Sequence, residues 1–88
     1  MATKRGKRIV LGRYVVADPE ICHGQLTFAG TRIFVADVLN DVAAGTPWET
    51  IVEDWHSSIS EDAIAEAVRL AREALLAHYR DLPAPASG

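Results

Sequence analysis

Hydrophobic and polar positions divide the chain into a β-rich first third and a helical remainder. Residues 9–16, IVLGRYVV, are mostly β-branched or aromatic, which is typical of strands, and a glycine–arginine pair interrupts them. The pattern predicts either one bent strand or a tight hairpin there. Further along, apolar residues predict short extended pieces at 26–28 and 33–35, with Gly24 and Gly30 as the places for tight reversals.

Two short amphipathic helices are predicted next, because apolar residues recur with the 3.6-residue period of a helix. The first covers residues 35–44. The second is expected to start with Thr46 as its cap, Pro47 in the first helical position and Glu49 completing a capping box. It should run to about Trp55 and bury an apolar face that includes both tryptophans.

The longest helix is predicted over residues 61–80, with Ser60 as its N-cap and with Glu61 and Asp62 favourable for its dipole. We expect Glu66 on its outer face. Two neighbouring apolar stripes run along this helix, formed by Ile64, Val68, Ala71, Leu75 and Tyr79 and by Ala63, Ala67, Leu70, Ala74 and Ala77. Apolar surface this wide exceeds what two short helices can cover, so we expect some of it to meet a partner.

This succession of helices is the layout of a trihelical helix-turn-helix unit, here with a β-rich N-terminal extension. The expected class is mainly α: one domain over residues 9–81, between a flexible basic arm (1–8) and a mobile tail (82–88). The 49% hydrophobic content is high for 88 residues and favours a homodimer. That dimer should bury Leu70, Ala74 and their neighbours, the β element, or both.

Two features of the sequence bear on the cellular location of the protein: the lack of a long apolar run and the single cysteine. No run of the sequence approaches the 18 apolar residues of a membrane-spanning helix, so we expect no membrane partner. The single cysteine, Cys22, cannot form an intrachain disulfide, which fits a reducing cytoplasm.

Charge is distributed unevenly along the chain. Residues 1–16 carry five basic residues and no acid, a net charge of +5, whereas the remainder carries four basic and twelve acidic residues, a net charge of −8. Such a basic arm often binds nucleic acid or an acidic protein surface. The alternative is that it only serves as a solubilising tail. The start of the long helix is acidic and would repel phosphate. Any DNA contacts should therefore come from the arm and the β element, through Lys4, Arg5, Lys7, Arg8 and Arg13.

Arg32 is the only basic residue between Arg13 and Arg69, and it stands in the apolar segment Gly30-Thr31-Arg32. One interpretation is structural: its guanidinium clamps the β element to the helices by bonding carbonyl or carboxylate oxygens. The alternative is that this segment, through Thr31 and Arg32, contacts a phosphate.

No combination of residues indicates catalysis or a cofactor. Cys22 and His23 are adjacent, but His56 and His78 are distant in sequence, and this spacing does not predict a metal site. A nucleophilic Cys22 paired with a distant histidine is formally possible, although a small buried cysteine is the commoner role. No phosphate-binding loop or dinucleotide motif is present. We therefore expect a protein without enzymatic activity or cofactor.

Three segments of the chain carry a resemblance to a known family: Asp18-Pro19-Glu20-Ile21-Cys22-x-Gly24, Gly30-Thr31-Arg32-Ile33-x-Val35 and Ala44-Gly45-x-Pro47-x-Glu49-x-Ile51. In combination they resemble a widespread bacterial and archaeal family catalogued as domain of unknown function 433. The resemblance covers roughly residues 14–79. It implies a homeodomain-like or winged-helix-like three-helix fold with a small N-terminal β element.

The resemblance also implies a function. Members of this family often lie beside genes for PIN-like nucleases, some resemble antitoxins of the VapB type, and the family has no catalytic motif. We therefore expect an antitoxin-like protein that neutralises an adjacent PIN-like ribonuclease toxin and also binds operator DNA. The alternative is a dimeric adaptor with no nucleic-acid role. The candidate partner-binding residues are Glu61, Asp62, Glu66, Leu70 and Ala74.

Overall fold

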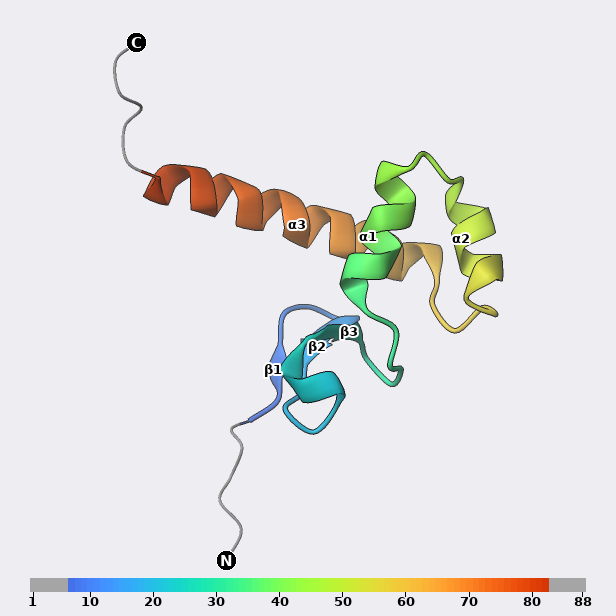
Figure 1. Ribbon diagram of the computed structural model, residues 1–88, viewed down its shortest axis with the longest axis horizontal. Helices are drawn as coiled ribbons and strands as arrows, with labels where there is room; N and C mark the ends of the chain where they lie inside the picture. The colour runs from blue at the N-terminus through green and yellow to red at the C-terminus, as the bar shows by residue number, and fades with distance from the viewer. Residues whose placement is uncertain (1–6, 83–88) are drawn as a thin grey trace, which may run out of the picture.

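The computed structural model describes residues 7–82, which form three helices and a three-stranded antiparallel sheet (Figure 1). The expected class, mainly α with a small N-terminal β element, is confirmed. The arm expected over residues 1–8 and the tail expected over 82–88 lie almost entirely outside the described residues. The elements are β1 (Ile9–Val10), β2 (Val15–Ala17), a 3-10 turn (Cys22–Gly24), β3 (Leu26–Phe28), α1 (Val35–Ala43), α2 (Trp48–Asp54) and α3 (Glu61–Asp81).

Residues 9–16 contain a tight hairpin rather than one bent strand. Val10 lies opposite Val16 in the β1–β2 pair, and the N–H of Leu11 donates to the carbonyl of Val15 at 2.9 Å to close the turn. β3 then pairs with the other edge of β2, so that β2 is the central strand. Both residues at the start of β2 are buried, because this strand lies between its neighbours and under the helices.

A tight turn follows β3. Gly30 has φ of 78°, in the left-handed region that glycine adopts at little cost, and Gly24 likewise has φ of 82°. The hydroxyl of Thr31 donates to the carbonyl of Phe28 at 2.8 Å and accepts from the N–H of Ile33 at 3.0 Å. Thr31 therefore holds the turn closed from within.

Two local predictions are wrong. The extended piece expected at 33–35 is not a strand: Phe34 makes a single bridge with Thr27, and α1 begins at the next residue. Thr46 does not cap α2, because Pro47 has an extended ψ of 141° and so occupies the N-cap position itself. The N-cap of α2 makes no side-chain cap hydrogen bond, and the expected capping box does not form among the described residues.

The core lies where the helices meet the sheet. α1 and α3 pack on each other and on the sheet, and α2 packs on both helices. Trp48 and Trp55 of the α2 region are half-buried against this core, as the apolar pattern predicted. The central buried residues are Val15, Phe28, Val35, Val38, Ile51, Ile59, Ala63, Ile64 and Ala67.

α3 has a packed first half and a projecting second half. Ser60 caps it as predicted, since its hydroxyl accepts from the N–H of Ala63 at 3.1 Å. The helix passes behind α1 and continues well beyond the rest of the molecule (Figure 1). Every residue from 72 to 82 is exposed. We call residues 72–82 the α3 arm.

Candidate functional site

The basic residues expected to contact DNA lie at the start of the chain and on the β1–β2 hairpin. Lys7, Arg8 and Arg13 are exposed, whereas Lys4 and Arg5 lie outside the described residues. The guanidinium of Arg13 lies 5.6 Å from the centroid of the neighbouring tyrosine ring, a cation–π distance. The described members of this set are therefore available to an anionic partner on the β side of the molecule.

The expectation that Glu66 lies on the outer face of α3 is wrong. It is only 5% exposed, and its carboxylate meets the turn of the β1–β2 hairpin. Its Oε1 accepts from the N–H of Arg13 at 2.8 Å, and its Oε2 accepts from those of Tyr14 at 2.7 Å and Val15 at 3.0 Å. Backbone donors in a turn need acceptors when the turn is covered, and this one carboxylate satisfies three of them.

Gly12 makes this contact possible. A Cβ at this position would lie 2.6 Å from Cδ of Glu66 and 2.7 and 2.8 Å from its two carboxylate oxygens, closer than non-bonded atoms come. A side chain at residue 12 would therefore force the hairpin or the Glu66 carboxylate to move. The signal in the sequence was a glycine inside a β-rich run, but nothing there indicated which of twelve acids it would meet.

The surroundings of Glu66 act on its acidity in opposite directions. Burial disfavours the charged carboxylate and by itself would raise the pKa. Three backbone N–H donors, with the positive charge of Arg69 nearby, favour the charged form and leave the pKa of Glu66 below its ordinary value. Glu66 is thus a charged latch between α3 and the hairpin, and we refer to it with Gly12 as the Gly12–Glu66 latch.

Stability should therefore depend on the charge of Glu66. Its pKa is lower in the folded chain than in the unfolded chain, where glutamate titrates at about 4.3. The stabilisation is thus fully present above that pH and is lost as the pH falls through the lowered value. In urea unfolding, the advantage of the wild type over Glu66→Gln should persist from neutral pH down to about pH 4.3 and should shrink at lower pH. An advantage that stays constant in acid would contradict this linkage.

Arg32 does not clamp the fold, so the structural interpretation of its guanidinium is wrong. Arg32 is exposed, and within residues 7–82 its guanidinium makes no hydrogen bond or ion pair. The clamp is unnecessary because the Thr31 hydroxyl already closes this turn. Arg32 instead lines a shallow pocket of about 300 Å³ together with Pro19, Glu20, Cys22 and His23. The phosphate interpretation of this segment stays a prediction.

Arg32→Ala is accordingly expected to change the free energy of unfolding by less than about 0.5 kcal/mol, as for other surface substitutions. Thr31→Val is the neighbouring comparison: it removes a hydroxyl that makes two hydrogen bonds and should cost about 1–2 kcal/mol. Chemical denaturation of the two variants tests both values. If Arg32→Ala proved the more destabilising of the two, the assignment of their roles would be reversed.

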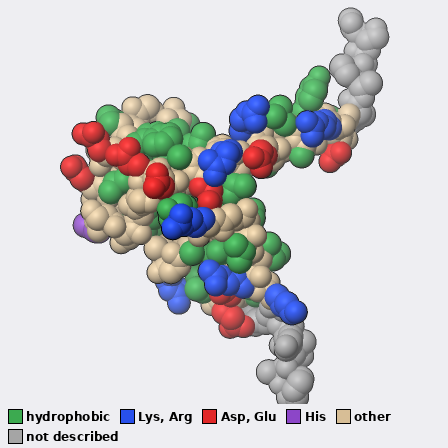
Figure 2. Space-filling model, turned by 180° about the vertical axis from the view of Figure 1, so that it is seen from behind, with side chains coloured by type: hydrophobic (Ala, Val, Ile, Leu, Met, Phe, Trp, Pro, Cys, Tyr) green, Lys and Arg blue, Asp and Glu red, His purple; other side chains and the backbone are tan. Residues whose placement is uncertain are grey.

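Acidic side chains gather on the helical end of the molecule. Residues 33–68 contain eight acids and no Lys or Arg, and all of these acids except Glu66 reach the surface. Figure 2 shows acidic groups over the end of the body that carries α2, whereas Lys and Arg lie along the α3 arm and toward the N-terminal side. We call this set the acidic face: Asp37, Asp41, Glu49, Glu53, Asp54, Glu61 and Asp62.

The five residues predicted to bind a partner do not form one surface. Glu61 and Asp62 are exposed on the acidic face, and Glu66 is buried under the hairpin. Leu70 and Ala74 line an apolar groove whose α3 wall begins at Ala67, about five residues or roughly 8 Å beyond Asp62. The other walls of this groove were not predicted, because they come from separate elements that no local sequence pattern connects.

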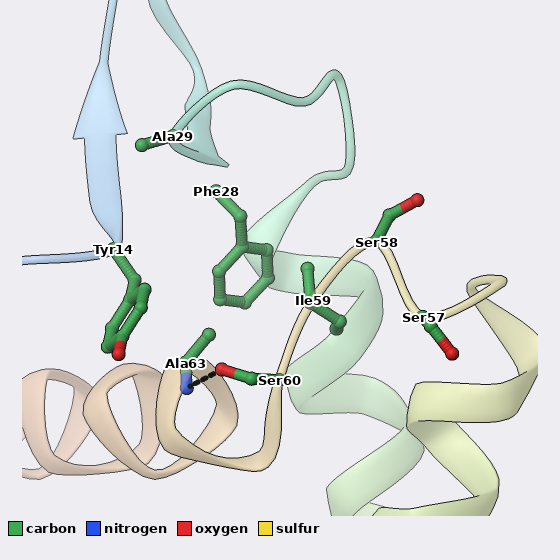
Figure 3. Close-up of a pocket in the computed structure, with 8 residues that line it drawn as sticks. All are labelled: Tyr14, Phe28, Ala29, Ser57, Ser58, Ile59, Ser60 and Ala63. Carbon is green, nitrogen blue, oxygen red and sulfur yellow. Dashed lines mark hydrogen bonds between the residues drawn. The ribbon is translucent and has the colours of Figure 1, made fainter.

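A pocket of about 220 Å³ lies between the hairpin and the α2–α3 loop (Figure 3). Phe28, Ile59 and Ala63 make its floor apolar. In Figure 3 the hydroxyls of Ser57 and Ser58 point away from Phe28. The hydroxyl of Ser60 is engaged in capping α3. Three serines thus surround this pocket without converging on a reacting group.

The described residues form neither a metal site nor a membrane span. Within residues 7–82, no group of three or more His, Cys, Asp or Glu side chains is arranged to hold a metal ion. α3 has the length to cross a bilayer, but it carries too many charges, and none of the described helices qualifies as a membrane span. The arrangement in this part of the chain offers binding surfaces and a buried latch.

Comparison with known proteins places these features in one family. The family described as protein of unknown function (DUF433) matches residues 15–77, more than two-thirds of the chain. The match begins at β2 and ends within α3, so it includes the Thr31 turn, the acidic face and Glu66. No curated protein and no solved structure matches the chain. The chain therefore belongs to the DUF433 family of proteins of unknown function.

Proposed function

We propose that this protein is a non-enzymatic, antitoxin-like regulator that binds and neutralises a PIN-like ribonuclease encoded beside it. The kind of partner comes from the family resemblance. The observation that supports the proposal is the acidic face, where seven acidic residues reach the surface with no Lys or Arg among residues 33–68. That face belongs to the packed helical body and so presents its charge from a rigid surface.

The mechanism is competition for a basic surface. A nuclease of this kind binds RNA through basic residues around a metal site held by carboxylates. The acidic face has the opposite charge, and such complementarity speeds association and favours the correct partner. On α2, Glu49 and Glu53 are both exposed and lie one helical turn apart. A body docked on the basic rim excludes RNA without any chemical step.

The test is co-expression with the nuclease from the adjacent gene, followed by pull-down and a growth assay. We expect a complex and rescue from toxicity. Glu49→Gln with Glu53→Gln should weaken both. The matched control is Glu73→Gln with Asp81→Asn, which removes the same charge from α3 outside the acidic face and should leave both intact. No complex and no rescue would end this proposal and leave the adaptor function.

Operator binding is the second part of the proposal, and it is supported by the exposed Lys7, Arg8 and Arg13 on the β side. Each phosphate contact should add about −0.9 to the slope of log affinity against log salt. Deleting residues 1–8 should therefore flatten the slope measured by fluorescence anisotropy. If the deletion left the slope unchanged while Glu61→Ala with Asp62→Ala abolished binding, DNA would have to bind the opposite face.

A further inference from the structure

An apolar groove runs where the hairpin, the start of β3, α1 and the middle of α3 meet. It has a volume of about 110 Å³, and no charged side chain is among the residues that line it. An adjoining pocket of about 410 Å³ shares Leu26, Val35 and Leu39 with it. The groove and this pocket thus form one continuous apolar surface. Its α3 wall consists of Ala67, Leu70, Ala71 and Ala74.

The α3 arm carries a second apolar surface directly beyond that wall. Leu75 is 65% exposed, Tyr79 71% and Leu82 49%, although all three are large apolar side chains. At 1.5 Å per residue the eight residues after Ala74 extend about 12 Å. Helices in proteins gain most of their stability from packing an apolar face, and this half of α3 has no such packing within the described residues.

We propose that the occupant of the groove is the α3 arm of a second copy of this chain. The two α3 helices cross antiparallel about a two-fold axis between Ala74 and Leu75. In this register Leu75 lies beside the axis and near its own copy. A single two-fold operation then fills both grooves and covers both arms. The alanines of the groove wall let the helices approach closely.

The exposed apolar area is of the size that a dimer needs. Beside the arm residues, the hairpin and β3 expose Ile9 (61%), Val10 (62%), Leu11 (40%) and Leu26 (41%). Together with Leu75, Tyr79 and Leu82 they expose on the order of 800 Å², about what each partner contributes to an interface of standard size. Leu11 and Leu26 line the groove itself.

Charge also favours a second copy over a nucleic acid. The arm carries Arg72, Glu73, Arg80 and Asp81, which sum to zero, and the groove lining is uncharged. A neutral apolar arm therefore matches an uncharged apolar groove of the same chain. Glu61 and Asp62 of the acidic face are left free on both copies, because they lie at the far end of α3 from the α3 arm.

Sedimentation velocity of the full chain at micromolar concentration tests the proposal. We expect twice the 9.6 kDa of one chain. Leu75→Glu should raise the dissociation constant at least about 100-fold, since it places a charge in the apolar contact. Leu76→Glu is the matched control, because Leu76 points to the other side of the arm and should keep the dimer. A monomeric wild type, or a Leu75→Glu chain that still dimerises, would overturn the proposal. The α3 arm would then be expected to bind a different protein.

Cross-linking tests the register. In a Cys22→Ser background, Leu75→Cys should be joined to its own copy by a short bis-maleimide, and Leu76→Cys should not. Both substitutions lie on the exposed arm, so circular dichroism should show the same helix content for each. Equal cross-linking at the two positions, or cross-linking at Leu76 alone, would overturn the antiparallel crossing.

Discussion

Glu66→Gln is expected to lower the free energy of unfolding by about 3 kcal/mol, which corresponds to a fall in Tm of about 15 °C for a domain of this size. The amide keeps one oxygen, but its NH₂ group faces an N–H donor instead of accepting from it. At least one of the backbone donors of Arg13, Tyr14 and Val15 then loses its partner in a covered site. Thermal and urea unfolding at neutral pH measure the loss.

Glu73→Gln is the matched control for this substitution. Glu73 lies two helical turns further along the same side of α3, but it is exposed. The same chemical change there should alter the free energy of unfolding by less than about 0.5 kcal/mol. Equal effects at the two positions would mean that the loss reflects charge or helix propensity, and that the three hydrogen bonds of Glu66 stabilise nothing.

Gly12→Ala is expected to have the second largest effect, a loss of about 2–3 kcal/mol, in the range of overpacking in a closely packed site. The added methyl would lie 2.6 Å from Cδ of Glu66, so either the hairpin or the carboxylate must move. Either movement lengthens the hydrogen bonds of the Gly12–Glu66 latch. Urea unfolding of this variant measures the cost.

A double-mutant cycle separates this mechanism from a general effect of alanine in a turn. Glu66→Ala removes the group that the new methyl would contact, so Gly12→Ala should cost much less in the Glu66→Ala background. The expected coupling is about 2 kcal/mol, as for residues in direct contact. Additive losses from the two substitutions would show that Gly12 is required for a reason other than the approach of Glu66.

The helices were predictable because each of them depends on local pattern. The 3.6-residue period identified α1, α2 and α3, and the Ser60 cap formed as expected because its acceptor and its donor are three residues apart. The β hairpin was predicted as one of two alternatives. The strand expected at 33–35 does not form, because its last residue, Val35, is the first residue of α1.

The latch was not predictable, because its two sides are more than 50 residues apart in sequence. The helical pattern predicted Glu66 on the outer face of α3, and the approach of the hairpin buries that position in the folded chain. Arg32 shows the reverse case. A lone cation in an apolar segment suggested burial, yet the segment turns outward at Gly30 and leaves the side chain in solvent.

The candidate site was predictable only in part, for the same reason. Glu61 and Asp62 reach the surface as expected, since residues in the first turn of a capped helix usually do. Leu70 and Ala74 were identified as apolar surface, but the rest of the groove comes from the hairpin, β3 and α1. The shape of the groove therefore depends on how elements distant in sequence pack together. Within the described residues, the structure thus offers two surfaces, an acidic one on the helical body and an apolar one at the arm.

Inhibition of the proposed PIN-like nuclease partner by the purified protein is the decisive measurement for the proposed function. Cleavage of a fluorescent RNA would be followed while the protein is titrated into the nuclease. We expect nuclease activity to be lost as the protein approaches a stoichiometric amount. The Glu49→Gln, Glu53→Gln variant should require much more protein, and the Glu73→Gln, Asp81→Asn variant should match the wild type. Full nuclease activity at excess wild-type protein, or equal inhibition by the two variants, would contradict the assignment of the acidic face to this partner.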